Sequence, residues 1–128
     1  MNFESISFVS ADQPKAKEAH QRLNDKYGSV SPEEADIIVA LGGDGLMLET
    51  LHAYMNLGTP IYGMNQGSVG FLMNEYNNAN LIDRLKEANE INVHPLEMIA
   101  LDTKNQKYTE LAINEVAIFR RTHQSAII

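Results

Sequence analysis

The sequence contains no cysteine, which excludes disulfide bonds, cysteine nucleophiles and thiolate metal sites. A chain without thiols fits a reducing compartment, so we expect a cytoplasmic protein. The first residues lack a basic segment followed by an apolar core, and no uninterrupted apolar run approaches ~18 residues. The sequence therefore predicts neither a secretory signal nor a membrane partner.

Basic residues are also scarce, with 10 Lys and Arg against 17 Asp and Glu and a formal net charge of −7. Nucleic-acid-binding proteins usually carry a basic face, and the only basic cluster here is Arg120-Arg121. We therefore expect no nucleic-acid partner. A small phosphorylated ligand stays compatible with this charge, because backbone N–H groups at a helix N-terminus can hold phosphate.

The four histidines are scattered and have no metal-ligand spacing. They are His20, His52, His94 and His123. The sequence has no serine–histidine–acid arrangement and no carboxylate pair typical of hydrolysis. From these residues we predict no protein-held metal site.

Apolar segments and amphipathic segments alternate over the first ninety residues. Strands are predicted at 5–10, 37–41 and 59–64, and helices at 14–27, 46–56 and 80–89. The segment 37–41 is apolar throughout, as is typical of a parallel strand covered on both faces. This alternation predicts an α/β fold, a Rossmann-like parallel sheet with helices on both faces, forming a nucleotide-binding domain over residues 1–90.

The pattern changes after residue 90. Segments 93–102 and 108–120 are strand-like, and the polar stretch 103–107 joins them, which predicts an antiparallel strand pair. The sequence ends on Ala126-Ile127-Ile128, whereas natural domains tend to end in polar residues. We interpret the change of pattern and this apolar ending as a second unit that is cut short or that needs a partner to cover it.

Gly42-Gly43-Asp44-Gly45 follows the apolar strand and precedes a helix. In open α/β sheets, ligands bind beyond the carboxyl ends of the strands, and glycines let a phosphate approach the backbone closely. Asp44 could accept a proton from a substrate hydroxyl or hold a magnesium ion beside phosphates. The same four residues are equally compatible with a tight strand-to-helix turn in which Asp44 caps the helix.

Two better-known phosphate motifs do not fit. The dinucleotide fingerprint fails because position 48, where a third glycine would follow Gly43 and Gly45, is Leu. The P-loop fails because the segment 63–68 has the wrong spacing and no lysine.

Two further segments are candidate ligand contacts. The glycine-rich segment 63–72 ends near Phe71, which could lie against an adenine ring or simply pack in the core. Asn114-Glu115 interrupts an apolar strand-like stretch, and adjacent strand residues point to opposite faces. One of the two polar side chains could therefore bind ribose hydroxyls on a covered face, or Glu115 could simply face water.

Three motifs in series resemble the NAD kinase family: the Gly42–Gly45 turn, Gly67-Ser68-Val69-Gly70-Phe71-Leu72, and Asn114-Glu115-Val116. Asn65, beside the second motif, matches as well. The Gly-Gly-Asp-Gly turn alone is shared with lipid kinases and phosphofructokinases, so the order and spacing of all three carry the resemblance. A departure is Leu46, where the family often has Thr.

The resemblance implies phosphorylation of the 2′-hydroxyl of the adenosine ribose of NAD to give NADP. The donor would be ATP or polyphosphate with a divalent metal, expected to be Mg²⁺. Asp44 would be the catalytic base, Gly45 would contact the substrate through its backbone, Phe71 would line the adenine, and Asn114 and Glu115 would hold adenosine groups. Family members continue into a β-rich domain that makes further NAD contacts and forms a homo-oligomer interface. The resemblance implies that residues 91–128 are a hinge and the first strands of this second domain, which is otherwise missing. The alternatives are a lipid or sugar kinase with the same turn, or an inactive nucleotide-binding fragment.

Overall fold

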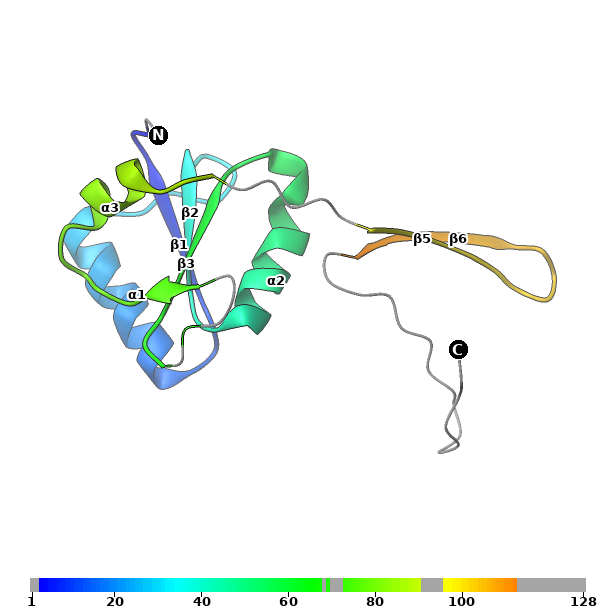
Figure 1. The fold of residues 1–128 in the computed structure, drawn as a ribbon, viewed down its shortest axis with the longest axis horizontal. Coiled ribbons are helices and arrows are strands. Elements are labelled where there is room, and N and C mark those ends of the chain that lie inside the picture. The colour runs from blue at the N-terminus through cyan, green and yellow to red at the C-terminus, as the bar shows by residue number, and fades with distance from the viewer. Residues whose placement is uncertain (1–2, 68, 70–72, 91–95, 113–128) are drawn as a thin grey trace. The chain divides into compact units, whose positions relative to one another are not determined.

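The computed structural model of the chain describes residues 3–67, 69, 73–90 and 96–112 (Figure 1). The chain divides into two compact units, Met1–Ile91 and Asn92–Ile128. The elements of the first unit are, in chain order, β1 (Ile6–Ser10), α1 (Pro14–Tyr27), β2 (Ile37–Leu41), α2 (Asp44–Tyr54), a 3-10 turn η1 (Met55–Leu57), β3 (Ile61–Asn65), β4 (Asn74–Glu75) and α3 (Leu81–Glu87). The second unit contains β5 (Leu96–Leu101) and β6 (Lys107–Ala112).

The first unit is built on a four-stranded sheet in the order β1-β2-β3-β4. All three neighbouring pairs are parallel. The register places Ile6 opposite Ile37 and Ile38 opposite Ile61. The predicted α/β fold is confirmed. The two-residue strand β4 was not predicted, because Asn74 and Glu75 carry no apolar signal.

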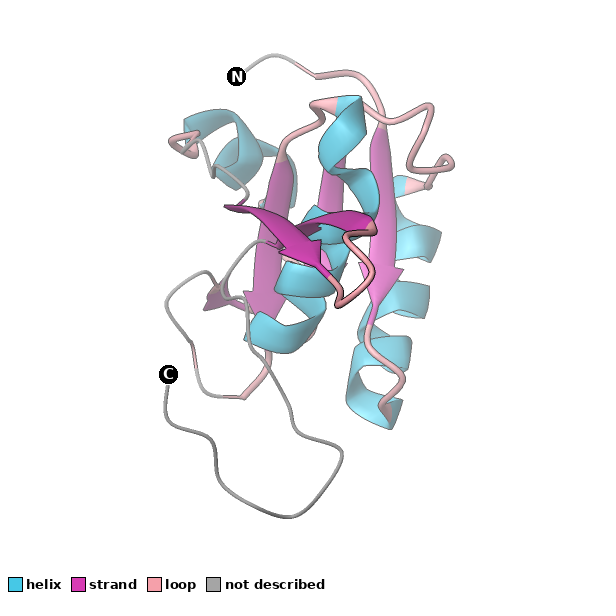
Figure 2. Ribbon diagram, turned by 90° about the vertical axis from the view of Figure 1, so that its right-hand side faces the viewer, coloured by secondary structure: helices cyan, strands magenta, loops and turns pink. Residues whose placement is uncertain are grey.

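Helices cover both faces of this sheet, and the alternation of side chains along β2 explains how. Ile37, Val39 and Leu41 pack in one apolar cluster with buried residues of α1 and α3. Ala40 packs in a second cluster with Met47 of α2 and with Met73. Because successive strand residues point to opposite faces, the wholly apolar sequence of β2 follows from burial on both sides. Figure 1 shows α1 and α3 on one side of the strands and α2 on the other, and in Figure 2 the helix α2 lies in front of the sheet.

Helix α1 begins and ends at the predicted residues. Pro14 occupies the first helical turn, where its missing N–H has no intrahelical partner to lose. Gly28 follows the last helical residue with φ +74, a left-handed value that glycine adopts without strain. Ala16, Ala19 and Leu23 are buried against the sheet.

The segment after α1 lies along the free edge of β1. After α1, the Val30 N–H donates a hydrogen bond of 2.9 Å to the Ile6 carbonyl, and the Phe8 N–H donates one of 3.2 Å to the Ser29 hydroxyl. These residues lie along the edge of β1 opposite to β2, because the Ser5 carbonyl accepts from the Ile37 N–H on the other edge. The chain then crosses β1 to form β2. Ligands of open α/β sheets bind beyond the carboxyl ends of the strands.

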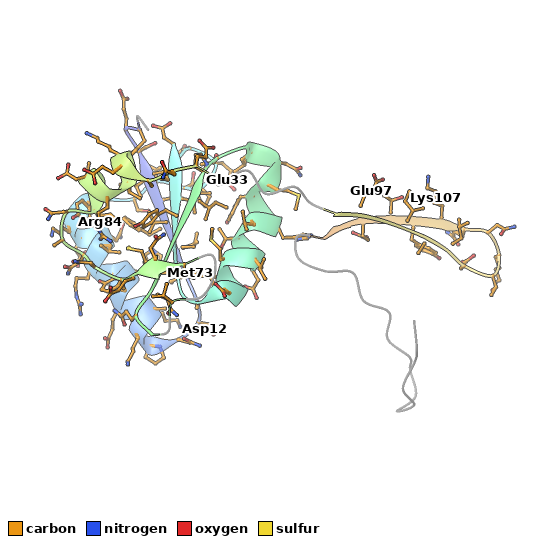
Figure 3. The ribbon with its side chains drawn as sticks, in the orientation of Figure 1. Asp12, Glu33, Met73, Arg84, Glu97 and Lys107 are labelled. Atoms are coloured by element: carbon orange, nitrogen blue, oxygen red, sulfur yellow. The ribbon has the colours of Figure 1, made fainter. Side chains whose placement is uncertain are left out.

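Helix α3 packs through two leucines and one partly buried arginine. Leu81 and Leu85 are fully buried, and Arg84 is half-buried. Its guanidinium lies 3.9 Å from the sulfur of Met64 and donates to the Asn77 carbonyl. A long side chain can bury its stem while keeping its charge solvated, which helical spacing alone does not reveal. Figure 3 labels Arg84 on α3.

The second unit, within the described residues, is an antiparallel hairpin of β5 and β6. Its turn is organised by Asp102, whose Oδ1 accepts hydrogen bonds of 2.8 Å from the N–H groups of Lys104 and Gln106. These bonds hold the pKa of Asp102 below its ordinary value. Glu97 and Lys107 point to the same side of the hairpin (Figure 3). The predicted strand pair is confirmed over residues 96–112, and the rest of segments 93–102 and 108–120 lies outside the described residues.

Across the part of the chain that the structure describes, no helix has the length and apolar character needed to cross a membrane.

Candidate active site

Helix α2 begins inside the glycine turn. Gly43 is the N-cap and Asp44 is the first helical residue, so the predicted start at residue 46 was two residues too late. The interpretation of Asp44 as a helix cap is not supported, because Gly43 holds that position and no side chain caps the helix. Asp44 instead places a carboxylate in the first turn, where the partial positive charge of a helix N-terminus favours an anion.

One carboxylate oxygen of Asp44 lacks a partner. Its Oδ1 is buried and accepts no hydrogen bond from any described residue. Buried polar atoms in folded proteins are nearly always hydrogen-bonded, and an unsatisfied one requires a specific explanation. A ligand that donates a hydroxyl proton, or a cation held with it, would satisfy this oxygen.

The three glycines of the turn differ in what the fold requires of them. A Cβ at Gly42 would lie 2.9 Å from Leu46 Cδ2 and 3.1 Å from the Cβ of Ala11, so these neighbours would have to shift to admit a larger residue. A Cβ at Gly43 would meet nothing closer than the Asn65 side-chain nitrogen at 3.9 Å, and one at Gly45 would meet nothing within 4 Å. Neither of these two has a positive φ. Within the described residues, neither packing nor backbone conformation explains Gly43 and Gly45, whereas close approach of a ligand would.

Backbone hydrogen bonds fix this turn to the neighbouring strands. The Ala11 N–H donates to the Leu41 carbonyl at 2.9 Å, and the Gly42 N–H donates to the Met64 carbonyl at 3.0 Å. The carboxyl ends of β1, β2 and β3 are therefore held together at one edge of the sheet. Asn65 is the last residue of β3, so its side chain joins Asp44 at this edge.

A cavity of about 280 Å³ opens beside the turn. Its lining residues come from the start of α1, the ends of β2 and β3, and the segment after β4: Gln13, Lys15, Ala16, Ala19, Leu41, Gly42, Met64, Asn65, Gln66, Gly67 and Tyr76. Sequence analysis did not identify Gln13, Lys15 or Tyr76. The available signal was that residues 11–15 also follow the carboxyl end of a parallel strand, where ligands bind.

The charges near this edge are few. Lys17 forms an exposed ion pair of 2.6 Å with Asp12, and this contact lowers the pKa of Asp12. Figure 3 labels Asp12. Lys15 lines the cavity and is exposed. Over residues 3–67, 69, 73–90 and 96–112, no three His, Cys, Asp or Glu side chains are grouped so as to hold a metal ion.

The predicted site residues are only partly visible. Asp44 and Gly45 lie at the start of α2, at the carboxyl edge of the sheet, with Asn65 nearby. Phe71, Asn114 and Glu115 lie outside the described residues. Their expected approach to Asp44 stays a prediction.

Comparison with known proteins gives a consistent result. Residues 2–93 match the family described as ATP-NAD kinase N-terminal domain. The chain is 52% identical over 121 residues to an NAD kinase of Caulobacter vibrioides, covering 94% of this chain and 46% of that protein. It is 51% identical over 124 residues to an NAD kinase of Rhizobium meliloti, covering 97% of this chain and 48% of that protein. The chain spans about half the length of these curated relatives.

The glycine turn of the chain lies at the carboxyl edge of a parallel sheet, and residues 2–93 match the family model. The chain therefore belongs to the NAD kinase family, of which it carries the N-terminal domain.

Proposed function

We propose that this chain supplies the catalytic base and part of the nucleotide site of an NAD kinase, which transfers a phosphoryl group from ATP to the 2′-hydroxyl of the NAD adenosine ribose. The observation that carries the proposal is the buried and unpartnered Oδ1 of Asp44. It lies at a helix N-terminus, beside two glycines that the fold itself does not require.

In this reaction the Asp44 carboxylate accepts the proton of the 2′-hydroxyl. The ribose oxygen forms a bond to the γ-phosphorus, the bond from that phosphorus to the β,γ-bridging oxygen breaks, and ADP leaves. Enzymatic phosphoryl transfer depends mainly on positioning and charge stabilisation. The backbone of Gly43 and Gly45 lets the phosphates approach α2, whose N-terminal N–H groups favour their negative charge.

A divalent cation fits this site only as a partner of the substrate phosphates. Asp44 offers a single carboxylate, and the described residues around it supply no further cluster of ligands. Mg²⁺ is commonly held by one or two carboxylates together with substrate phosphates. Bound in this way, it would neutralise phosphate charge and leave the Asp44 carboxylate free to accept the proton.

The other family contacts are part of the same proposal. Phe71 would lie against the adenine of NAD, and Asn114 and Glu115 would bind adenosine groups. Residues 91–128 would form the hinge to a β-rich domain, through which the whole protein would form a homo-oligomer. A cytoplasmic location accords with NADP synthesis from ATP.

The test is steady-state NADP formation from NAD, ATP and Mg²⁺, compared with the Asp44→Asn variant. Asparagine keeps the size of the side chain but cannot take the proton, and a general base contributes about 10²- to 10⁴-fold to rate. The variant should lose at least about a hundredfold in kcat. Undiminished kcat would overturn the role of Asp44.

Two alternatives are separated by further measurements. A panel of lipid and sugar acceptors tests the related kinases that share the turn, because turnover of such an acceptor in place of NAD would favour them. Calorimetry with NAD separates binding from turnover. Binding of NAD without turnover would favour an inactive nucleotide-binding fragment.

A further inference from the structure

Two methionine side chains fill the space beside Gly63, a buried residue in the middle of β3. Among the described glycines only Gly28 and Gly58 have a positive φ, so the backbone conformation of Gly63 does not require glycine. A Cβ at this position would lie 2.6 Å from Met73 Sδ, 2.7 Å from Met73 Cε and 3.3 Å from Met47 Sδ. The two thioethers therefore occupy the space that a side chain at position 63 would take.

Met73 is held on β3 by its side chain and by the residue that follows it. The Met73 side chain is 6% exposed and packs in one cluster with Ala40 and Met47, and Figure 3 labels it. Asn74, the first residue of β4, donates a hydrogen bond of 3.1 Å from its side-chain Nδ2 to the Gly63 carbonyl. Strand β4 in turn pairs with β3 in the parallel sheet. The contact between Met73 and Gly63 is therefore tied to the backbone of β3.

The other methionine of this contact, Met47, lies at the start of the helix that carries Asp44. Its side chain is 7% exposed, and its N–H donates a hydrogen bond of 3.1 Å to the Gly43 carbonyl. That bond closes the first turn of α2, in which Asp44 is the first helical residue. The positions of the Met47 side chain and of the Asp44 carboxylate are therefore set by the same helical turn.

We propose that Met73 is a positioning residue for the phosphoryl transfer. Its thioether, seated on Gly63 against Met47, fixes the first turn of α2 and with it the Asp44 carboxylate. A methionine side chain is unbranched and polarisable, and it fills irregular gaps of this kind. Misplacing a reacting group by about 1 Å can lower a rate by about a hundredfold, so a distant packing contact can control catalysis. The inference rests on the proposed function, in which Asp44 is the base.

Two substitutions in the full 128-residue chain perturb this contact in different ways. Met73→Ala removes the thioether, whereas Gly63→Ala keeps every apolar group and pushes the Met73 thioether aside with its new Cβ. The matched control is Leu85→Ala, which removes a fully buried side chain from the cluster on the opposite face of the sheet. NMR measures hydrogen exchange of the Met47 amide relative to the Val39 amide of β2, urea unfolding measures stability, and NADP formation gives kcat.

Each single variant should raise the exchange ratio of Met47 to Val39 by about tenfold, because the first turn of α2 then opens locally. The control should lower the urea midpoint and leave this ratio unchanged. In the double variant the effects should be less than additive, because the new Cβ at position 63 no longer meets the Met73 thioether. An unchanged ratio in the single variants, additive effects, or an equal rise in the control would overturn the inference. Gly63→Ala alone decides the question if Met73→Ala does not fold.

The kinetic measurement separates positioning from a contribution to stability alone. In both single variants kcat per folded chain should fall by about tenfold or more, and the control should equal wild type. NADP formation that depends on Asp44 but not on Met73 would overturn this inference and leave the proposed function intact. Equal kcat for wild type and Asp44→Asn would count against the proposed function instead. The exchange ratio, which needs no activity, would still decide whether Met73 holds the first turn of α2.

Discussion

Gly45→Ala should stabilise the fold while weakening nucleotide binding. Gly45 is the second residue of α2, and its φ is not positive, so alanine can adopt its backbone conformation. A Cβ there would meet no atom within 4 Å. Alanine at this position should therefore not lower the stability of the fold. It should interfere only with a ligand that approaches the turn.

The magnitude follows from helix propensity. Alanine in place of glycine within a helix is worth about 0.5–1 kcal/mol, and part of this comes from lower entropy of the unfolded chain. Because Gly45 lies in the first turn, we expect the lower end, about 0.5 kcal/mol. The new methyl group would occupy the space in which the phosphates lie and should raise the Kd for ATP with Mg²⁺.

The assay is urea unfolding of the full chain, with calorimetric ATP binding on the same samples. The matched control is Gly42→Ala, whose Cβ would lie 3.1 Å from Ala11 Cβ and 2.9 Å from Leu46 Cδ2. Such overpacking typically costs about 1–3 kcal/mol, so this variant should be destabilised. If Gly45→Ala were destabilised as much as Gly42→Ala, or bound ATP as wild type does, the reasoning on the turn would be refuted.

Three further predictions concern the fold. Asp36→Ala should lower stability at neutral pH: Asp36 Oδ2 accepts from the N–H groups of Glu4 and Ser5, and these bonds lower its pKa from 3.8. The stability that the Asp36 carboxylate contributes is therefore present above pH 3.8 and is lost as the pH falls through its lower, folded-state pKa. The urea midpoint should fall less on acidification for the variant than for wild type. An equal fall in both proteins would contradict this. Leu23→Ala removes a fully buried side chain and should lower the unfolding free energy by about 3 kcal/mol, which the urea midpoint would show; a change below about 1 kcal/mol would contradict the placement of α1. Asp102→Ala should speed hydrogen exchange at the Gln106 amide, measured by NMR, and unchanged exchange would contradict the turn.

Much of the first unit could be predicted from the sequence, because its signals are local. Pro14 and Gly28 mark the ends of α1, and the apolar run of β2 reflects burial on both faces. The start of α2 was missed because glycines have low helix propensity, yet hydrogen bonds to β1 and β3 hold the turn and the helix begins at Asp44.

The site was predictable only where one segment carries it. The Gly42–Gly45 turn is contiguous, so its place after β2 followed from the pattern. The cavity wall joins Gln13, Gln66 and Tyr76 from three separate segments, and no periodicity connects them. The unsatisfied Oδ1 of Asp44 depends on packing that a sequence does not specify.

The most direct test of the central claim is NADP formation from NAD, ATP and Mg²⁺, measured for the wild-type chain and for Asp44→Asn under identical conditions. If Asp44 is the base at the head of α2, the variant should be folded to the same extent and should lose at least about a hundredfold in kcat. Equal rates in the two proteins would contradict the account.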